Sequence, residues 1–233
     1  MVLDILIIVK NTFLVYILTM KNFLCSLLDW IYKKKCYCCS SSQESIPLCS
    51  HCYNELEFNP PQVARILNGA DVYIAGMYEK NLQKIIRGLK YHKKRDLAYY
   101  QAKFMYEYFQ TLDIRETFQV VPVPLHKKRQ KQRHYNHMEL VAEEFCKLTG
   151  FQPNFKLIKR IKHTKPQYKL TRKERLENLE NAFEVDTTNL LPYPILLIDD
   201  ICTSGATFES MINEFHKNGI NNIKCFATTS PLD

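Results

Sequence analysis

Two adjacent carboxylates followed by small hydroxyl residues form the most distinctive chemical pattern in the chain. Asp199 and Asp200 follow the apolar run Ile-Leu-Leu-Ile, and residues 203–207 read Thr-Ser-Gly-Ala-Thr. When such a loop opens a helix, its backbone N–H groups, its hydroxyls and the positive end of the helix dipole suit a phosphate. The two carboxylates then need another target, either sugar hydroxyls or a magnesium ion. A phosphorylated ribose meets both requirements.

The flanking residues predict the elements that would hold this loop. The run 195–198 is short and branched, as in a strand buried in a parallel sheet, and we expect the chain to turn at Asp199. Helically spaced apolar residues and a terminating glycine follow the loop, namely Phe208, Met211, Ile212, Phe215 and Gly219. The whole stretch resembles the signature of type I phosphoribosyltransferases. A P-loop and a dinucleotide loop are excluded because neither motif is present; an Asp pair that merely caps the helix is the simpler alternative.

The cysteines predict a structural zinc site. The chain has nine of them, an odd number that fits metal ligation in a reducing cytosol better than a closed disulfide framework. Two C-x2-C pairs can complete a tetrahedron of thiolates, formed by Cys36, Cys39, Cys49 and Cys52. Cys38 or His51 could substitute for one ligand, but neither keeps both pairs at the right offset. Four thiolates leave no open position for water, so the predicted role is structural.

Positive charge is concentrated in one part of an otherwise ordinary globular composition. Residues 120–176 contain fifteen Lys/Arg and four Glu, which gives +11 and leaves −3 of the total +8 for the rest. The partner of this segment should be polyanionic, either nucleic acid or the phosphates of a small substrate. The apolar stretch 1–30 is interrupted by Asp4, Lys10, Lys21 and Asp29. We therefore expect no transmembrane span and no export signal, and a cytoplasmic protein that can associate with the membrane.

Strands and helices alternate along the rest of the chain, which predicts a doubly wound, mostly parallel α/β sheet. A strand-like stretch from Ala70 precedes a helix that ends at Lys90 and Tyr91, and a strand over 119–123 leads into a basic loop and a helix from about Met138. Ligands of such sheets bind beyond the carboxyl ends of the strands. The loops 124–137 and 199–207 can therefore face one ligand.

Five pieces, in order, make the chain from about Met20 to Leu232 resemble the ComF family of bacterial competence proteins. They are LLDWIY followed by paired cysteines, IIRGLKY, VPVPLHKKRQKQRHYNH, TKPQYKLTRKERLENLENAF and LLIDDICTSGAT. One departure is the sequence Arg-His-Tyr-Asn-His at 133–137, where the family usually has Arg-Gly-Phe-Asn-Gln. On this basis we expect an apolar extension and helix over 1–35, a zinc knuckle over 36–60, and a type I phosphoribosyltransferase-like domain over 61–233.

The resemblance implies a role in natural transformation, in which single-stranded DNA crosses the inner membrane with a companion helicase. It also implies binding of phosphoribosyl pyrophosphate with magnesium. Carried over to matching positions, Asp199 and Asp200 are the catalytic pair that holds the ribose hydroxyls. The 5′-phosphate would be bound by Thr203, Ser204, Gly205, Ala206 and Thr207. We rank Arg129 and Arg133 first for the pyrophosphate, because guanidinium binds phosphate in bidentate fashion.

The basic segment supplies the candidate contacts to DNA. These are Lys127, Lys128, Lys131, Arg172, Lys173 and Arg175, and the alternative for each is a solvated basic surface. The resemblance also implies a flap over the ligand that carries Thr164, Gln167, Arg172, Arg175 and Asn178. Tyr135 and Tyr168 could stack on bases, although packing is the commoner role of such residues.

Three functions remain compatible with these residues. The first is a competence factor that handles single-stranded DNA and uses a phosphoribosyl pyrophosphate pocket. The second is an active phosphoribosyltransferase of nucleobase salvage, against which stands the absence of a recognisable base-binding hood. The third is a zinc-knuckle adaptor with a non-catalytic pocket. The sequence leaves turnover and the acceptor open.

Overall fold

The computed structural model describes residues 34–44, 46–126, 129–131, 134–162, 178–179 and 181–231. The chain divides into two compact units, 1–49 and 50–233. The expected domains 1–35, 36–60 and 61–233 stay a prediction. Within the described residues, no helix is both long enough and apolar enough to cross a bilayer.

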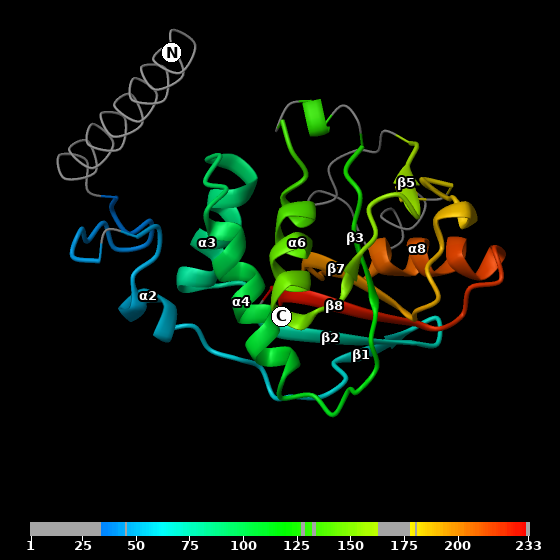
Figure 1. The fold of residues 1–233 in the computed structure, drawn as a ribbon, viewed down its shortest axis with the longest axis horizontal. Coiled ribbons are helices and arrows are strands. Elements are labelled where there is room, and N and C mark those ends of the chain that lie inside the picture. The colour runs from blue at the N-terminus through cyan, green and yellow to red at the C-terminus, as the bar shows by residue number, and fades with distance from the viewer. Residues whose placement is uncertain are drawn as a thin grey trace, which may run out of the picture. The chain divides into compact units, whose positions relative to one another are not determined.

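A six-stranded sheet forms the centre of the second unit (Figure 1). Its order is β1 (Arg65–Leu67), β2 (Ala70–Met77), β8 (Ile223–Ser230), β7 (Ile195–Ile201), β3 (Gln119–Pro122) and β4 (Gln152–Pro153). All neighbouring strands are parallel except β1 and β2. The predicted mixed α/β fold with a mostly parallel sheet is therefore confirmed. A separate antiparallel pair consists of β5 (Ile158–Arg160) and β6 (Phe183–Val185).

Helices cover both faces of this sheet. The helices in the described part of the chain are α2 (Ser50–Asn54), α3 (Lys80–Tyr91), α4 (Leu97–Phe109), α6 (His137–Thr149), α8 (Ala206–Lys217) and the short 3-10 helix η2 (Thr187–Asn189). Phe226 of β8 packs against Phe109 of α4 and Phe145 of α6. Cys225 belongs instead to the core beneath α8. Because successive side chains of a strand point to opposite faces, α4 and α6 lie on one face and α8 on the other.

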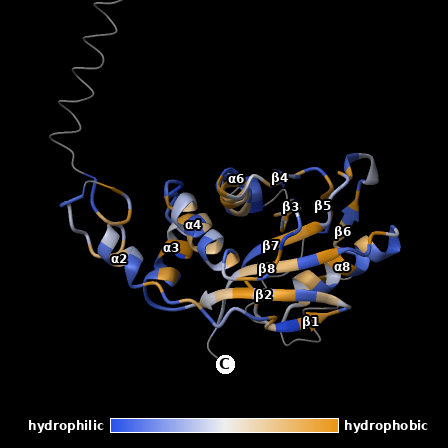
Figure 2. Cartoon of the chain, turned by 60° about the horizontal axis from the view of Figure 1, so that its bottom comes forward, coloured by the Kyte–Doolittle hydropathy of each residue, from blue (hydrophilic) through white to orange (hydrophobic). Residues whose placement is uncertain are grey.

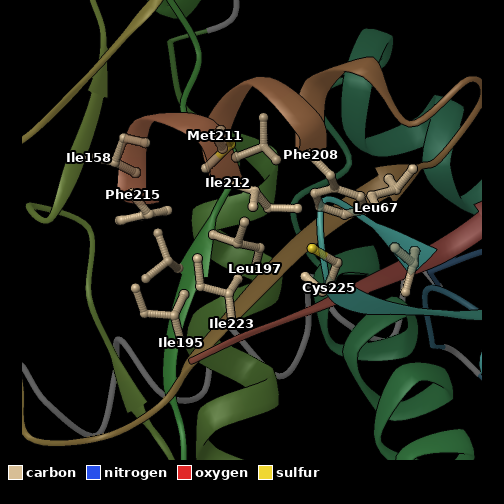
Figure 3. Close-up of a cluster of buried hydrophobic side chains, with 14 of the residues drawn as sticks. Leu67, Ile158, Ile195, Leu197, Phe208, Met211, Ile212, Phe215, Ile223 and Cys225 are labelled. Carbon is tan, nitrogen blue, oxygen red and sulfur yellow. The ribbon is translucent and has the colours of Figure 1, made fainter. Parts of the chain in front are cut away.

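The helical spacing seen in the sequence produces the buried side of α8. Phe208, Met211, Ile212 and Phe215 are almost completely buried and point toward the strands in Figure 3. Their neighbours on the strands include Leu197 and Cys225. Hydrophobic stretches follow the central strands β2, β7 and β8 in Figure 2. The predicted end of the helix is also confirmed: Gly219 has a φ of 76°, and its N–H donates to the carbonyl of His216.

The strand before the loop is longer than the sequence indicated. We expected a turn at Asp199, but β7 continues through Ile201, where it still pairs with Thr229 of β8. The carbonyl of Thr229 then accepts a hydrogen bond from the N–H of Cys202. The long partner strand β8 satisfies these backbone groups, so the two aspartates lie within a strand. Their side chains consequently point to opposite faces of the sheet.

Candidate functional site

A cavity of about 250 Å³ lies at the carboxyl end of β7. The end of α3, the loop after β3, the start of α6, the strand β5 and the start of α8 all contribute to its wall. The polar residues at the cavity are Lys90, Arg129, His137, Arg160, Asp199, Asp200, Thr203 and Thr207. The position at a strand end is the usual ligand site of open α/β sheets.

The loop 203–207 brings the first turn of α8 to the cavity. Gly205 has a φ of 83°, a left-handed conformation that a side chain disfavours, and an added Cβ would lie 2.6 Å from Cδ1 of Leu67. Arg65 of β1 donates a hydrogen bond of 2.8 Å to the carbonyl oxygen of Thr203. Because α8 begins at Ala206, the N–H groups of its first turn and the positive end of its dipole are at this wall. The geometry suits an anion.

Asp200 is the centre of a buried charged cluster. Its side chain is 6 % exposed, and its Oδ2 contacts both Lys90 Nζ, at 2.7 Å, and His137 Nε2. Burial by itself favours the neutral acid, but the charges of Lys90 and His137 outweigh it and hold the pKa of Asp200 well below its usual range. Burial also opposes the charge of Lys90, yet Asp200 raises the pKa of that lysine. The end of α3 and the start of α6 are thus tied to β7.

Asp199 has a different environment on the other face of the strand. Its Oδ1 accepts a hydrogen bond of 2.8 Å from the N–H of Asp200. Burial, followed by the neighbouring charge of Asp200, raises the pKa of Asp199, while Lys90 and Arg160 act in the opposite direction. The carboxyl group of Asp199 is not held by Lys90 and His137 as Asp200 is, so it can serve an incoming ligand, whose hydrogen-bond donors would favour the charged form. Asp199 therefore differs from Asp200 in what it can do.

Two guanidinium groups, those of Arg129 and Arg160, line the cavity together. Arg160 of β5 is 8 % exposed, and its guanidinium lies 5.5 Å from the ring centre of Phe183. Burial, and then the positive charge of Arg129, lower the pKa of Arg160 to about 10, whereas Asp199 raises it. Like charges held near one another at a cavity favour an anionic ligand, because the ligand relieves their repulsion.

Seven of the predicted ligand residues line this one cavity. They are Asp199, Asp200, Thr203, Gly205, Ala206, Thr207 and Arg129. Ser204 is in the same loop, where its Oγ lies 3.5 Å from the N–H of Ala206, and Lys131 is exposed in the basic loop. Asn178 is described but does not line the cavity. The predictions for Lys127, Lys128, Arg133, Thr164, Gln167, Tyr168, Arg172, Lys173, Arg175 and the N-terminal helix lie outside the described residues.

Three residues of the site were given no role from the sequence. Lys90 stood at the end of a predicted helix, and His137 stood out as the residue that replaces the usual glutamine. Both could have been paired with Asp200 only if the ends of α3, α6 and β7 were known to meet. Arg160 carried no local signal at all, because it was one of many basic residues in a basic segment.

Tyr135 has a structural role in the basic loop. It is 9 % exposed, and its hydroxyl donates a hydrogen bond of 2.6 Å to the carbonyl of Leu89. The guanidinium of Arg95 lies over the Tyr135 ring, 4.5 Å from the ring centre, in a cation–π contact. Of the two roles considered for Tyr135, packing is the one that these contacts favour.

The four paired cysteines form a cluster that fits zinc. The sulfur atoms of Cys36, Cys39, Cys49 and Cys52 lie within 4.8 Å of one another. A tetrahedron with Zn–S bonds of about 2.3 Å has edges of about 3.8 Å, and the Cys39 and Cys49 sulfurs are 3.7 Å apart. Burial raises the pKa of the Cys36 thiol, but backbone N–H groups, with that of Cys49 first, lower it to about 6. This donor set favours a thiolate-bound metal.

The fold and sites define an α/β protein with a cavity suited to an anion at the end of β7 and a four-cysteine cluster. No protein-family model matches the chain. The chain is 28 % identical to competence protein F of Haemophilus influenzae, over 81 % of this chain and 87 % of that protein. It is also 22 % identical to the DNA utilization protein YhgH of Salmonella typhimurium, over 82 % of this chain and 81 % of that protein. The corresponding Escherichia coli protein is 24 % identical, over 73 % and 72 %. These similarities confirm the expected resemblance to the ComF family.

Proposed function

We propose that this protein acts in DNA uptake during natural transformation, where it handles incoming single-stranded DNA and binds phosphoribosyl pyrophosphate with magnesium. The names of its relatives, competence protein and DNA utilization protein, support the first part. One observation carries the second part: a phosphate-type loop at a helix N-terminus, a carboxylate and two guanidinium groups share one cavity.

The two ends of the ligand would meet different chemistry. Residues 203–207 would bind the 5′-phosphate through backbone N–H groups and hydroxyls. Asp199 would accept hydrogen bonds from the ribose hydroxyls, and Asp200 would fix the adjoining backbone through its contacts with Lys90 and His137. Arg129, with Arg133 from the same loop, would bind the pyrophosphate, to which we add Arg160. Magnesium would supply charge neutralisation at that pyrophosphate.

Calorimetry with phosphoribosyl pyrophosphate and magnesium tests the pocket. Asp199→Asn should weaken binding at least tenfold, because an amide cannot replace a carboxylate that accepts two hydroxyl donors. Asp113→Asn is the matched control, since that carboxylate is exposed and its partner Arg115 is exposed as well. Equal affinity of the wild type and Asp199→Asn would refute the assignment of the ribose.

Binding of DNA is tested separately, with a fluorescent single strand and a salt titration. Neutralising phosphates releases condensed counterions, so the log–log slope should be about −0.7 per contact. Replacing Lys127, Lys128 and Lys131 by serine should make the slope shallower and leave the metal content unchanged. Binding that is independent of salt would remove DNA from the direct partners.

An active phosphoribosyltransferase of nucleobase salvage is the second candidate. Arg129 and Arg160 at the cavity favour it, because cations placed there would stabilise a departing pyrophosphate. Release of pyrophosphate in the presence of one nucleobase, and not in its absence, would establish turnover. No release with any nucleobase would leave a binding function at the same pocket.

We further propose a structural zinc ion at the four cysteines and a cytoplasmic location, next to a companion helicase at the inner membrane. The state of the thiols supports this compartment: no disulfide joins the eight cysteines in the described part of the chain, as expected in a reducing environment. A four-thiolate site has no open position for catalysis, so the zinc would stabilise the fold around it.

A further inference from the structure

The connection between α3 and α4 carries a second group of positive charges, outside the basic segment 120–176. All six residues 91–96 are exposed, and they include Lys93, Lys94, Arg95 and a single acid, Asp96. The ion pairs formed within the described part of the chain do not involve Lys93 or Lys94. These two ammonium groups are therefore available for an external anion.

Exposed aromatic rings flank these cations. Tyr91 is 63 % exposed and Tyr99, in the first turn of α4, is 43 % exposed. The Tyr99 ring meets Tyr100 edge-on, with the ring centres 5.4 Å apart. Large rings at the surface forfeit the free energy that burial would provide, so their exposure beside cations indicates a partner with flat apolar groups and negative charge.

This turn is continuous with the cavity. Lys90 and Tyr91, which end α3, both line the cavity wall. The turn is also fastened to the basic loop, through the Tyr135 hydroxyl on Leu89 and the Arg95 guanidinium over the Tyr135 ring. Helices α3 and α4 lie side by side in Figure 1 and pack against each other. A ligand that follows the basic loop would therefore reach the turn as well.

We propose that residues 91–95, together with Tyr99, form a binding surface for single-stranded DNA beside the cavity. Lys93 and Lys94 bind backbone phosphates, and Tyr91 and Tyr99 stack on unpaired bases. Single strands are the partner because their bases have free faces, whereas a duplex presents mainly phosphates to a protein surface. The identity of the polymer rests on the function proposed above, while the surface itself is a new assignment.

Fluorescence anisotropy with labelled oligothymidine of about 20 nucleotides, together with a hairpin duplex, tests this surface. Lys93→Ser/Lys94→Ser removes two phosphate contacts, so the log–log salt slope should become shallower by about 1.4. If the variant and the wild type bind equally at 1 M salt, the variant should then bind about 25-fold more weakly than the wild type at 0.1 M salt. The matched control is Lys147→Ser/Lys217→Ser, because these lysines are also exposed and lie at the far ends of α6 and α8. The control should bind the single strand as the wild type does.

The stacking part is tested at Tyr91. Tyr91→Leu should weaken binding of the single strand about fivefold or more, and Tyr91→Trp, which keeps a large ring, should retain it. Equal losses in both variants, or a comparable loss for the hairpin duplex, would overturn the assignment of single strands. Circular dichroism should confirm that all variants remain folded, as expected for exposed positions.

The outcomes separate this surface from the function on which it rests. If the wild type binds the oligonucleotide and the lysine variant binds as tightly as its control, the surface is wrong and DNA handling stands. If the wild type does not bind, both fail. Phosphoribosyl pyrophosphate affinity should be unchanged in Lys93→Ser/Lys94→Ser, because neither lysine lines the cavity. A parallel loss of that affinity would indicate damage to the pocket and overturn the inference.

Discussion

Replacement of Lys90 by methionine should destabilise the protein far more than the loss of a surface lysine. Lys90 Nζ lies 2.7 Å from Asp200 Oδ2, and the two side chains are 14 % and 6 % exposed. The methionine side chain is apolar and similar in length to the methylene chain of lysine, so the main change is the loss of the ammonium group. The variant leaves a buried carboxylate with His137 as its remaining charged partner.

The magnitude follows from the burial of this pair. Removing one partner of a buried ion pair typically costs about 3–5 kcal/mol, and the remaining His137 contact places the expected cost at about 3 kcal/mol. This is a large part of a typical unfolding free energy of about 5–15 kcal/mol. Adding Asp200→Asn removes the stranded charge, so the double variant should recover at least about 1 kcal/mol relative to Lys90→Met alone.

Urea unfolding at pH 7, followed by circular dichroism, measures this effect. With a slope of about 2 kcal/mol per M, a loss of 3 kcal/mol lowers the midpoint by about 1.5 M. Lys147→Met is the control: it loses a surface pair with Glu144 in which the lysine is 67 % exposed, and should cost less than about 0.5 kcal/mol. The reasoning would be refuted if both variants had the same midpoint, or if Asp200→Asn gave no rescue.

Three further predictions concern the metal, acid stability and the loop. Purified protein should contain one zinc per chain by metal analysis, and less than half an equivalent in the wild type would exclude the site. Cys38→Ser should keep the zinc, and Cys49→Ser should lose it. The pKa of Asp200 is lower in the folded state than in the unfolded chain, so its stabilising contribution is present above about pH 4 and is lost as the pH falls toward the folded value. Acidification should therefore lower the unfolding free energy of Asp200→Asn less than that of the wild type. Identical pH profiles of the two proteins would contradict this. Gly205→Ala should cost about 1–2 kcal/mol in urea unfolding and weaken phosphate binding, because the left-handed backbone disfavours a Cβ and the new atom would press on Leu67; an unchanged midpoint would show that the loop relaxes freely.

Much of the fold was readable from local patterns. The helical spacing over 208–215 and the apolar run 195–198 predicted α8 and β7. Burial of one side of a helix places apolar residues at helical spacing, and burial of both faces of a strand gives a continuous apolar run. The end of β7 was wrong by three residues. A strand ends where its partner stops supplying hydrogen bonds. The residues around Asp199 do not reveal how far the partner strand β8 extends.

Two chemical centres could be predicted from residue types and spacing alone: the paired cysteines, which can each bind a metal through two sulfurs, and the loop 203–207, whose residue types suit a phosphate. Only the tertiary structure separated the roles of Asp199 and Asp200. Adjacent residues in a strand face opposite sides of the sheet, so only Asp200 meets Lys90 and His137. Those two partners come from helices that lie far away in the sequence, and Arg160 lines the cavity from a separate strand pair. Electrostatic effects of this kind depend on distance and burial in space, which the order of residues does not contain.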